Sequence, residues 1–410
     1  MSRYLLLFLL FSLAPALPAQ TNWGAYYGIT CSSIDTTEAY LPPPAAFLSG
    51  SNQVQTQIEL NFTDNVPAIA RSSMRFAADI WGSFLLSDVT VNVDVDWEDR
   101  MDERLLASAG PATLFRDFGG AVPNTWYAVA LAEAIAGREL NDPFAADINV
   151  NVNSTANWYF GTDGQTPRSQ IDLASVFLHE LGHGLGFLSS ADTVSITELG
   201  LGFGDRLIIY DLFIETEEGN GISDAALFGN PSPELLEAAV SNDLVFDGES
   251  AVARNGNRRV PIFAPGTFDV GSSLSHLDEF TYRPGTPNAL MTPFLAAGEA
   301  AHDIGPVTLG IFEDMGWPLR FDLPVSDRTP EPQAFAVRPN PAVGRVQIDN
   351  PFSASATLSV VSTAGRILRR ESLPAAAVAH SVDLTGMAPG VYQLLIDAPG
   401  ERALARVLVR

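Results

Sequence analysis

The chain has 410 residues, 46% of them hydrophobic, and a formal net charge of −25, so it can bury a sizeable core and carry an accessory module. A phosphate backbone is bound by clustered positive charge, and this acidic composition therefore excludes nucleic acid as the partner. Cys31 is the only cysteine, which excludes an intrachain disulfide. A thiolate there can cap a metal in a latent precursor, but we interpret Cys31 as a buried or free thiol.

The first 19 residues predict a secretory signal peptide. Arg3 is followed by an apolar run from Tyr4 to Leu13 and then by small residues and prolines. This run is too short for a stable membrane span, and no later segment is apolar for long enough to provide one. We therefore expect a protein that is exported through the periplasm and is secreted or held at the cell surface.

Residues 20–325 are expected to form one mixed domain of the α+β class. VTVNVDVDW at 89–97 and ADINVNVNS at 146–154 alternate apolar and polar residues, which predicts two half-buried strands. AVALAEAIAGREL at 128–140 predicts a helix. Whether residues 20–100 are a removable propeptide or part of the catalytic domain stays open.

A second predicted helix, at 170–187, carries the motif His179-Glu180-Leu181-Gly182-His183, with Asp172 as a possible cap. Residues four apart lie on one face of a helix, so His179 and His183 can bind one Zn²⁺ ion. Glu180 lies beside them, where a carboxylate can act as general base towards a water that the metal has made more acidic. The motif therefore predicts hydrolysis of a peptide bond.

A catalytic zinc ion usually has a third protein ligand, and the remaining histidines are His276, His302 and His380. His380 lies in the C-terminal part of the chain and is most simply a solvated side chain. His276 and His302 remain as candidates, with the carboxylates of Asp192 and Glu198 as weaker alternatives.

Four stretches of the sequence together resemble the leishmanolysin-like branch of the metzincin metallopeptidases: HELGHGLGF, SHLDE, NALMTP and GPVTLGIFEDMGW. The resemblance covers about residues 140–320 and implies a zinc peptidase domain with a long insertion. It further implies that His276 is the third ligand, that Met291 is the methionine beneath the metal, and that Gly186 lets the chain turn off the helix. It departs from the commoner metzincin pattern at Ser189, where the third histidine would otherwise stand.

The polar, proline-rich stretch PVSDRTPEPQ predicts a linker, placed at 326–335. Beyond it, residues 336–410 contain short alternating runs typical of a small all-β, sandwich-like domain. Pro339-Asn340-Pro341, Gly365-Arg366 and Gly390-Val391-Tyr392 resemble the C-terminal sorting domain of the type IX (Por) secretion system. The resemblance implies that the type IX machinery is a partner.

The leading hypothesis is a secreted zinc endopeptidase that acts on protein or peptide substrates, with His179, His183 and His276 as ligands and Glu180 as general base. One alternative is a zinc amidohydrolase acting on a non-peptide amide. The other is a surface adhesion or binding protein whose zinc is structural, although such a site has no need of Glu180.

Overall fold

A computed structural model describes residues 19–22, 29–32, 36–48, 54–100, 104–203, 206–320, 333–348, 352, 356–362, 367–374, 380–388, 390–398 and 401–410. The chain divides into two compact units, Met1–Arg320 and Phe321–Arg410. The predicted signal peptide at 1–19 and the predicted linker at 326–335 lie almost entirely outside the described residues.

The first unit is built on a five-stranded sheet with the order β2-β6-β9-β5-β4. Its strands are β2 (Ile29–Ser32), β4 (Ile58–Phe62), β5 (Val91–Glu98), β6 (Leu105–Pro111) and β9 (Ile148–Asn153). Strands β4, β5 and β9 are parallel, whereas β6 is antiparallel to β9 and β2 is antiparallel to β6. Both strands predicted from alternation are present as β5 and β9, and alternate residues of β5 are buried.

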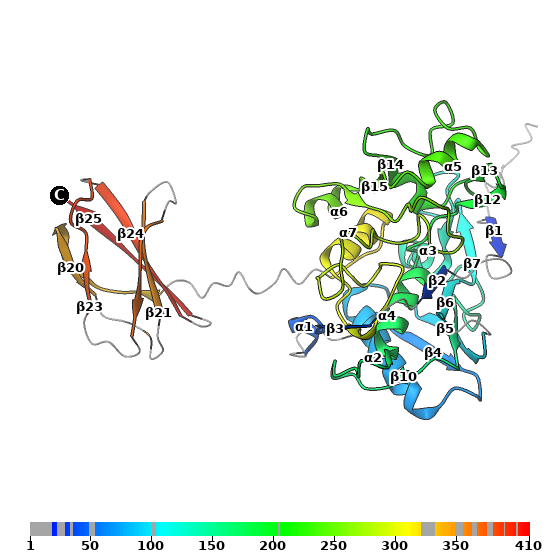
Figure 1. Cartoon of the computed structure of the whole chain (residues 1–410), viewed down its shortest axis with the longest axis horizontal. Helices are drawn as coiled ribbons and strands as arrows, with labels where there is room; N and C mark the ends of the chain where they lie inside the picture. Colours follow the sequence, from blue (N-terminus) through cyan, green and yellow to red (C-terminus); the bar gives the residue numbers. More distant parts are fainter. Residues whose placement is uncertain are drawn as a thin grey trace, which may run out of the picture. The chain divides into compact units, whose positions relative to one another are not determined.

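The longer helices of this unit are α2 (Ala68–Phe84), α3 (Val129–Ala136), α4 (Leu173–Gly184) and α7 (Pro306–Met315). Helix α2 packs against α4 in the core, and the Trp81 indole donates to the Leu178 carbonyl at 2.8 Å (Figure 1). Helix α3 is shorter than the helix predicted at 128–140. It ends because Gly137 adopts the left-handed conformation with φ of 63°.

Shorter elements complete the first unit. Two small sheets have three strands each: β1 (Ala19–Asn22), β7 (Thr113–Arg116) and β8 (Tyr127–Ala128) form one, and β14 (Ile214–Thr216), β15 (Leu244–Phe246) and β16 (Val260–Pro261) form the other. Three further sheets have two strands each. They pair β3 (Thr36–Leu41) with β17 (Ala297–Ala301), β10 (Trp158–Tyr159) with β11 (Ile171–Asp172), and β12 (Asp192–Ser195) with β13 (Glu198–Gly200). The short helices are α1 (Ala45–Leu48), the 3₁₀ helix η1 (Ile209–Phe213), α5 (Pro233–Ala239) and α6 (Glu249–Arg254).

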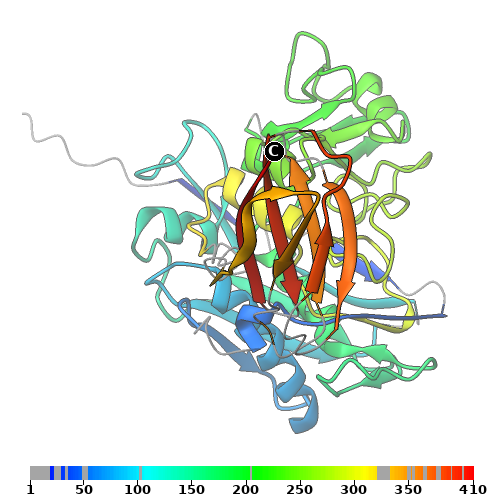
Figure 2. The ribbon, with the colours of Figure 1, turned by 90° about the vertical axis from the view of Figure 1, so that its left-hand side faces the viewer.

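The second unit contains only strands among its described elements, as Figure 2 shows from the side. These are β18 (Gln333–Ala334), β19 (Val337–Val343), β20 (Arg345–Ile348), β21 (Ala356–Ser362), β22 (Ile367–Leu373), β23 (His380–Asp383), β24 (Gly390–Ala398) and β25 (Glu401–Val409). Their order is β22-β21-β24-β25-β19-β20-β23, with β18 also paired to β25. Buried side chains such as Leu358, Leu394 and Val407 form its own core.

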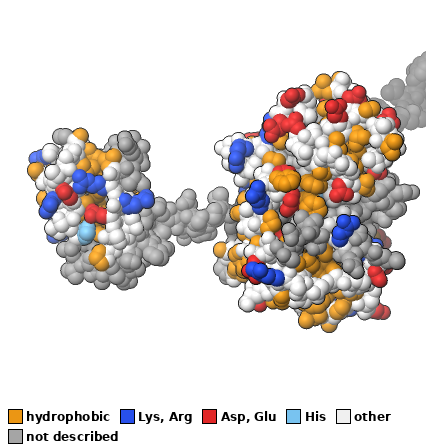
Figure 3. Space-filling model, viewed as in Figure 1, with side chains coloured by type: hydrophobic (Ala, Val, Ile, Leu, Met, Phe, Trp, Pro, Cys, Tyr) orange, Lys and Arg blue, Asp and Glu red, His pale blue; other side chains and the backbone are white. Residues whose placement is uncertain are grey.

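The two units together give a mixed α/β architecture with several sheets and a separate β unit, in line with the coarse prediction. Within the described residues, none of the helices has the length and apolar character needed to cross a membrane. On the face of the first unit seen in Figure 3, arginine side chains are interspersed with Asp and Glu and form no extended basic patch.

Candidate metal centre

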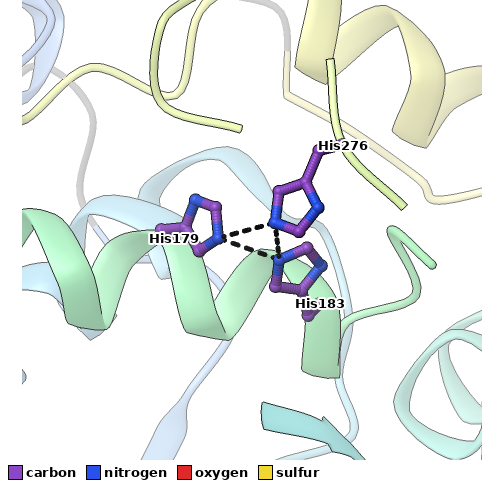
Figure 4. Close-up of side chains that lie close together, drawn as sticks. All are labelled: His179, His183 and His276. Atoms are coloured by element: carbon purple, nitrogen blue, oxygen red, sulfur yellow. Dashed lines mark hydrogen bonds between the residues drawn. The ribbon is translucent and has the colours of Figure 1, made fainter. Parts of the chain in front are cut away.

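Helix α4 presents the two motif histidines to the interior of the first unit. The helix begins as predicted, because the Asp172 carboxylate accepts hydrogen bonds from the Ser175 N–H at 2.8 Å and the Ser175 hydroxyl at 2.7 Å. His179 and His183 lie one turn apart on the same face, and both are buried. Their rings point towards a third ring, that of His276 (Figure 4).

The three imidazoles converge through their Nε2 atoms. These atoms are 2.9 Å apart between His179 and His183, 3.2 Å between His183 and His276, and 3.3 Å between His179 and His276, as the dashed lines in Figure 4 mark. A tetrahedral zinc ion with Zn–N distances of about 2.0–2.1 Å places nitrogen ligands about 3.3 Å apart. The arrangement therefore fits a shared metal ion.

The other nitrogen of each ring faces a backbone carbonyl. The Nδ1 atoms donate to Leu290 O at 2.6 Å from His179, to Phe187 O at 2.7 Å from His183, and to Ser272 O at 2.8 Å from His276. This fixes the proton of each neutral ring on Nδ1, so all three Nε2 atoms are acceptors and cannot hydrogen bond to one another. Three lone pairs directed at one point form a set of ligand atoms that could hold a metal ion.

Burial keeps these rings neutral. Desolvation lowers the pKa of His179 to about 4, and it lowers the pKa of His183 and His276 well below the usual value, with mutual repulsion adding to the effect. Neutral imidazole is the form that binds a metal ion.

Glu180 lies beside the cluster and is completely buried. Desolvation raises the pKa of its carboxyl group well above the usual value, while the Cys31 N–H and the charge of Arg100 lower it to a smaller extent. By hydrogen-bond geometry, neither carboxylate oxygen has a partner among the described residues. A buried carboxyl group with free oxygens is suited to taking up a proton.

Ser189 stands where the commoner metzincin pattern has a histidine, and its contacts help to position the loop that carries His276. Its backbone N–H donates to the Ser275 hydroxyl at 3.0 Å, directly before His276. Its own hydroxyl donates to the buried Asp211 carboxylate at 2.6 Å. These contacts tie the end of the motif segment to η1 and to the loop that carries His276.

Met291 and Gly186 also lie next to the motif helix. Met291 is fully buried beneath α4, and a Cβ atom added at Gly182 would meet its sulfur at 2.7 Å. Gly186 has φ of 123°, a conformation that side chains rarely adopt, just where the chain leaves the helix.

His302 lies elsewhere, so the structure brings His276 and not His302 to the motif histidines. The Nε2 atom of His302 lies 2.8 Å from the Asp172 carboxylate, and both side chains are fully buried. The His302 ring packs edge-on against Phe76 and Tyr40. His380, in the second unit, lies 3.3 Å from Glu371.

Cys31 is buried, and its surroundings could not be predicted from the sequence. Its sulfur and the ligand atoms of His179 and Glu180 all lie within 4.8 Å of one another. Among the described residues, Cys31, His183 and His276 do not form a group whose ligand atoms all lie within 4.8 Å of one another. Only the strand pairing of β2 brings the thiol here, and no local sequence pattern signals it.

Comparisons with known proteins identify two segments. Residues 141–200, which include α4, match a family described as SPBPB7E8-like. Residues 336–410 match the secretion system C-terminal sorting domain. The search among curated proteins gives no match. The C-terminal match identifies the second unit as a sorting domain, and the protein is therefore secreted or displayed at the cell surface through the type IX system.

Proposed function

We propose that the first unit is a zinc endopeptidase with a metzincin-like fold, acting outside the cell on protein or peptide substrates. The observation that carries this proposal is the convergence of three Nε2 lone pairs beside the buried Glu180 carboxyl group. Three histidines leave a zinc ion one open position, which is what a catalytic site needs. The matched export domain supports an extracellular substrate.

Each side chain has a defined role in this proposal. His179, His183 and His276 would hold the ion, which supplies a Lewis acid for the scissile carbonyl and for the attacking water. Glu180 takes the proton from that water and passes it to the leaving amine. The carbonyls of Leu290, Phe187 and Ser272 keep the three rings in the tautomer that binds metal.

The position of Cys31 favours one alternative, a binding protein with a structural zinc ion. A structural site is closed by a fourth protein ligand, and the Cys31 sulfur lies close to His179. However, a structural site gives no reason for a buried carboxyl group with free oxygens at Glu180. A zinc amidohydrolase would use the same residues on a non-peptide amide.

The test compares the zinc-loaded chain without its signal peptide with its Glu180→Gln variant on an unfolded protein substrate. The proposal predicts new peptide termini with the first protein and at least about 100-fold slower cleavage with the variant at equal zinc content. Equal rates would exclude Glu180 as general base. Turnover of small amides without protein cleavage would support the amidohydrolase.

A further inference from the structure

The short turn at 272–276, which carries the third histidine, has a strained backbone. Leu274 has φ of 64°, a left-handed conformation that a leucine rarely adopts, and its side chain is only 1% exposed. Such a conformation persists only where the surrounding contacts hold it. The turn therefore depends on its neighbours for the shape that directs His276 at the two motif histidines.

One group of contacts fixes the turn internally. The Ser272 carbonyl accepts from His276 Nδ1 at 2.8 Å and from the Ser275 N–H at 3.2 Å. The Leu274 N–H donates to the Phe263 carbonyl at 2.8 Å, and the Phe263 N–H donates to the His276 carbonyl at 2.9 Å. These bonds set the shape of the turn and attach it to the preceding segment, but none of them reaches the motif segment.

A second path joins the turn to the end of the motif segment and then to η1. The Ser275 hydroxyl accepts from the Ser189 N–H at 3.0 Å, and the Ser189 hydroxyl donates to the Asp211 carboxylate at 2.6 Å. The same carboxylate accepts from the Ser190 N–H at 3.2 and 3.3 Å and from the Ser190 hydroxyl. All four side chains are buried, so water does not compete for these bonds.

The charge of Asp211 strengthens this path. Burial raises the pKa of its carboxyl group from 3.8 to about 6, and the hydrogen bonds from Ser189 and Ser190 offset part of the increase. The group is therefore ionised at neutral pH. A hydrogen bond that an ionised group accepts is about twice as strong as one between neutral groups, so Asp211 fixes both serines more firmly than a neutral side chain would.

The neighbouring residue of η1 supports another ligand of the cluster. The Tyr210 ring packs on the Phe187 ring, with the two centroids 5.2 Å apart. The Phe187 carbonyl accepts from His183 Nδ1 at 2.7 Å. Two consecutive residues of η1 thus contact the groups that hold His183 and His276.

We propose that Asp211 is a positioning residue of the metal centre: through Ser189 and Ser275 it holds the strained turn so that His276 completes the set of three ligands. The inference rests on the proposed function, because it assumes that the three histidines bind zinc. It assigns a role to η1, which lies in the chain between the motif and His276.

The experiment measures the zinc affinity of the chain without its signal peptide, in competition with a chelator. Ser275→Ala removes the acceptor of the Ser189 N–H, and Asp211→Asn replaces the charged acceptor by a neutral side chain of similar size. Ser73→Ala and Asp314→Asn are the matched controls, because these side chains are hydrogen-bonded elsewhere in the first unit. Visible absorption of the cobalt-loaded proteins reports the geometry of the ligands.

We expect Ser275→Ala and Asp211→Asn each to weaken zinc binding by at least about tenfold, as is typical when a contact that orients a metal ligand is lost. Both should also change the cobalt spectrum, whereas the controls should match the wild type. Wild-type zinc affinity in both variants would overturn the positioning role and leave the metal centre intact. A wild-type chain that binds no zinc would overturn the metal centre, and both proposals with it.

The zinc measurement also separates this inference from the peptidase function. The expected pattern of zinc affinities without cleavage of any substrate would overturn the peptidase function alone. Ser275→Ala removes one hydroxyl group and leaves every partner of Asp211 in place, so it tests the path even where Asp211→Asn prevents folding.

The double variant Asp211→Asn/Ser275→Ala distinguishes one path from two separate disturbances of the fold. If both side chains act on His276 through Ser189, the second substitution should add little to the loss of zinc affinity that the first one causes. Full multiplication of the two losses would show that they act independently, and it would contradict the path. Thermal unfolding of the metal-free variants and controls shows which losses of affinity follow from general destabilisation.

Discussion

The Nε2 atoms of His179 and His276 lie 3.3 Å apart, although 97 residues separate the two histidines in the chain. The distance depends on contacts that join α4 to the 271–295 loops, including the His179 bond to Leu290 O and the Ser189 bond to the Ser275 hydroxyl. The candidate site is thus a property of the packed unit and not of the motif alone.

The first prediction concerns Asp172, which caps α4 and also contacts the buried His302. Asp172→Ala should lower the free energy of unfolding by about 2–4 kcal/mol, because the helix loses its cap and the His302 Nε2 atom loses its partner. Chemical denaturation measures the change, with Asp192→Ala in β12 as control. A loss below about 1 kcal/mol would show that this contact does not stabilise the helix.

The second prediction concerns Gly184 at the end of α4. Alanine normally stabilises a helix relative to glycine, by about 1 kcal/mol. Here a Cβ atom would collide with the Ile148 side chain of β9, so Gly184→Ala should destabilise the protein by about 1–3 kcal/mol. Gly119→Ala, where no atom lies within 4 Å of the added Cβ, should be close to neutral by the same measurement.

The third prediction concerns pH and Glu133, which is 1% exposed. Burial, with repulsion from Asp147, raises the pKa of this carboxyl group from 4.5 to about 8. The unfolded chain loses this proton at lower pH than the folded one. The contribution of Glu133 to the stability of the folded protein is therefore greatest below about pH 4.5, and it falls as the pH rises towards 8. The full effect is at most about 4–5 kcal/mol.

Glu133→Gln should remove this dependence while keeping Oε1 as the acceptor for the N–H groups of Leu140 and Asn141. Thermal unfolding between pH 5 and 9 measures it. The wild-type Tm should fall with pH more steeply than that of the variant, and parallel curves would show that Glu133 is ionised in the folded protein over this range.

The fourth prediction concerns export. Deletion of residues 336–410 removes the matched sorting domain, so the truncated chain should accumulate in the periplasm instead of reaching the medium or cell surface. Immunoblots of the cell fractions measure it, and the full-length Glu180→Gln variant should be exported normally. Export of the truncated chain at the wild-type level would refute the role of the tail.

Local chemistry made part of this structure predictable. Alternation identified β5 and β9, and a capping residue with helical spacing identified α4 with its two histidines. His276 depended on a resemblance, because no local pattern links it to a helix 93 residues away. The place of Cys31 could not be predicted, since it follows from long-range pairing between β2 and β6.

Zinc stoichiometry tests the central claim most directly. Wild type, His276→Ala and the matched control His380→Ala are each equilibrated with zinc and a competing chelator, and bound zinc is measured per chain. The account predicts one zinc ion for the wild type and for His380→Ala, and at least about 100-fold weaker binding for His276→Ala because only two histidine ligands remain. Full zinc occupancy of His276→Ala under the same competition would contradict it.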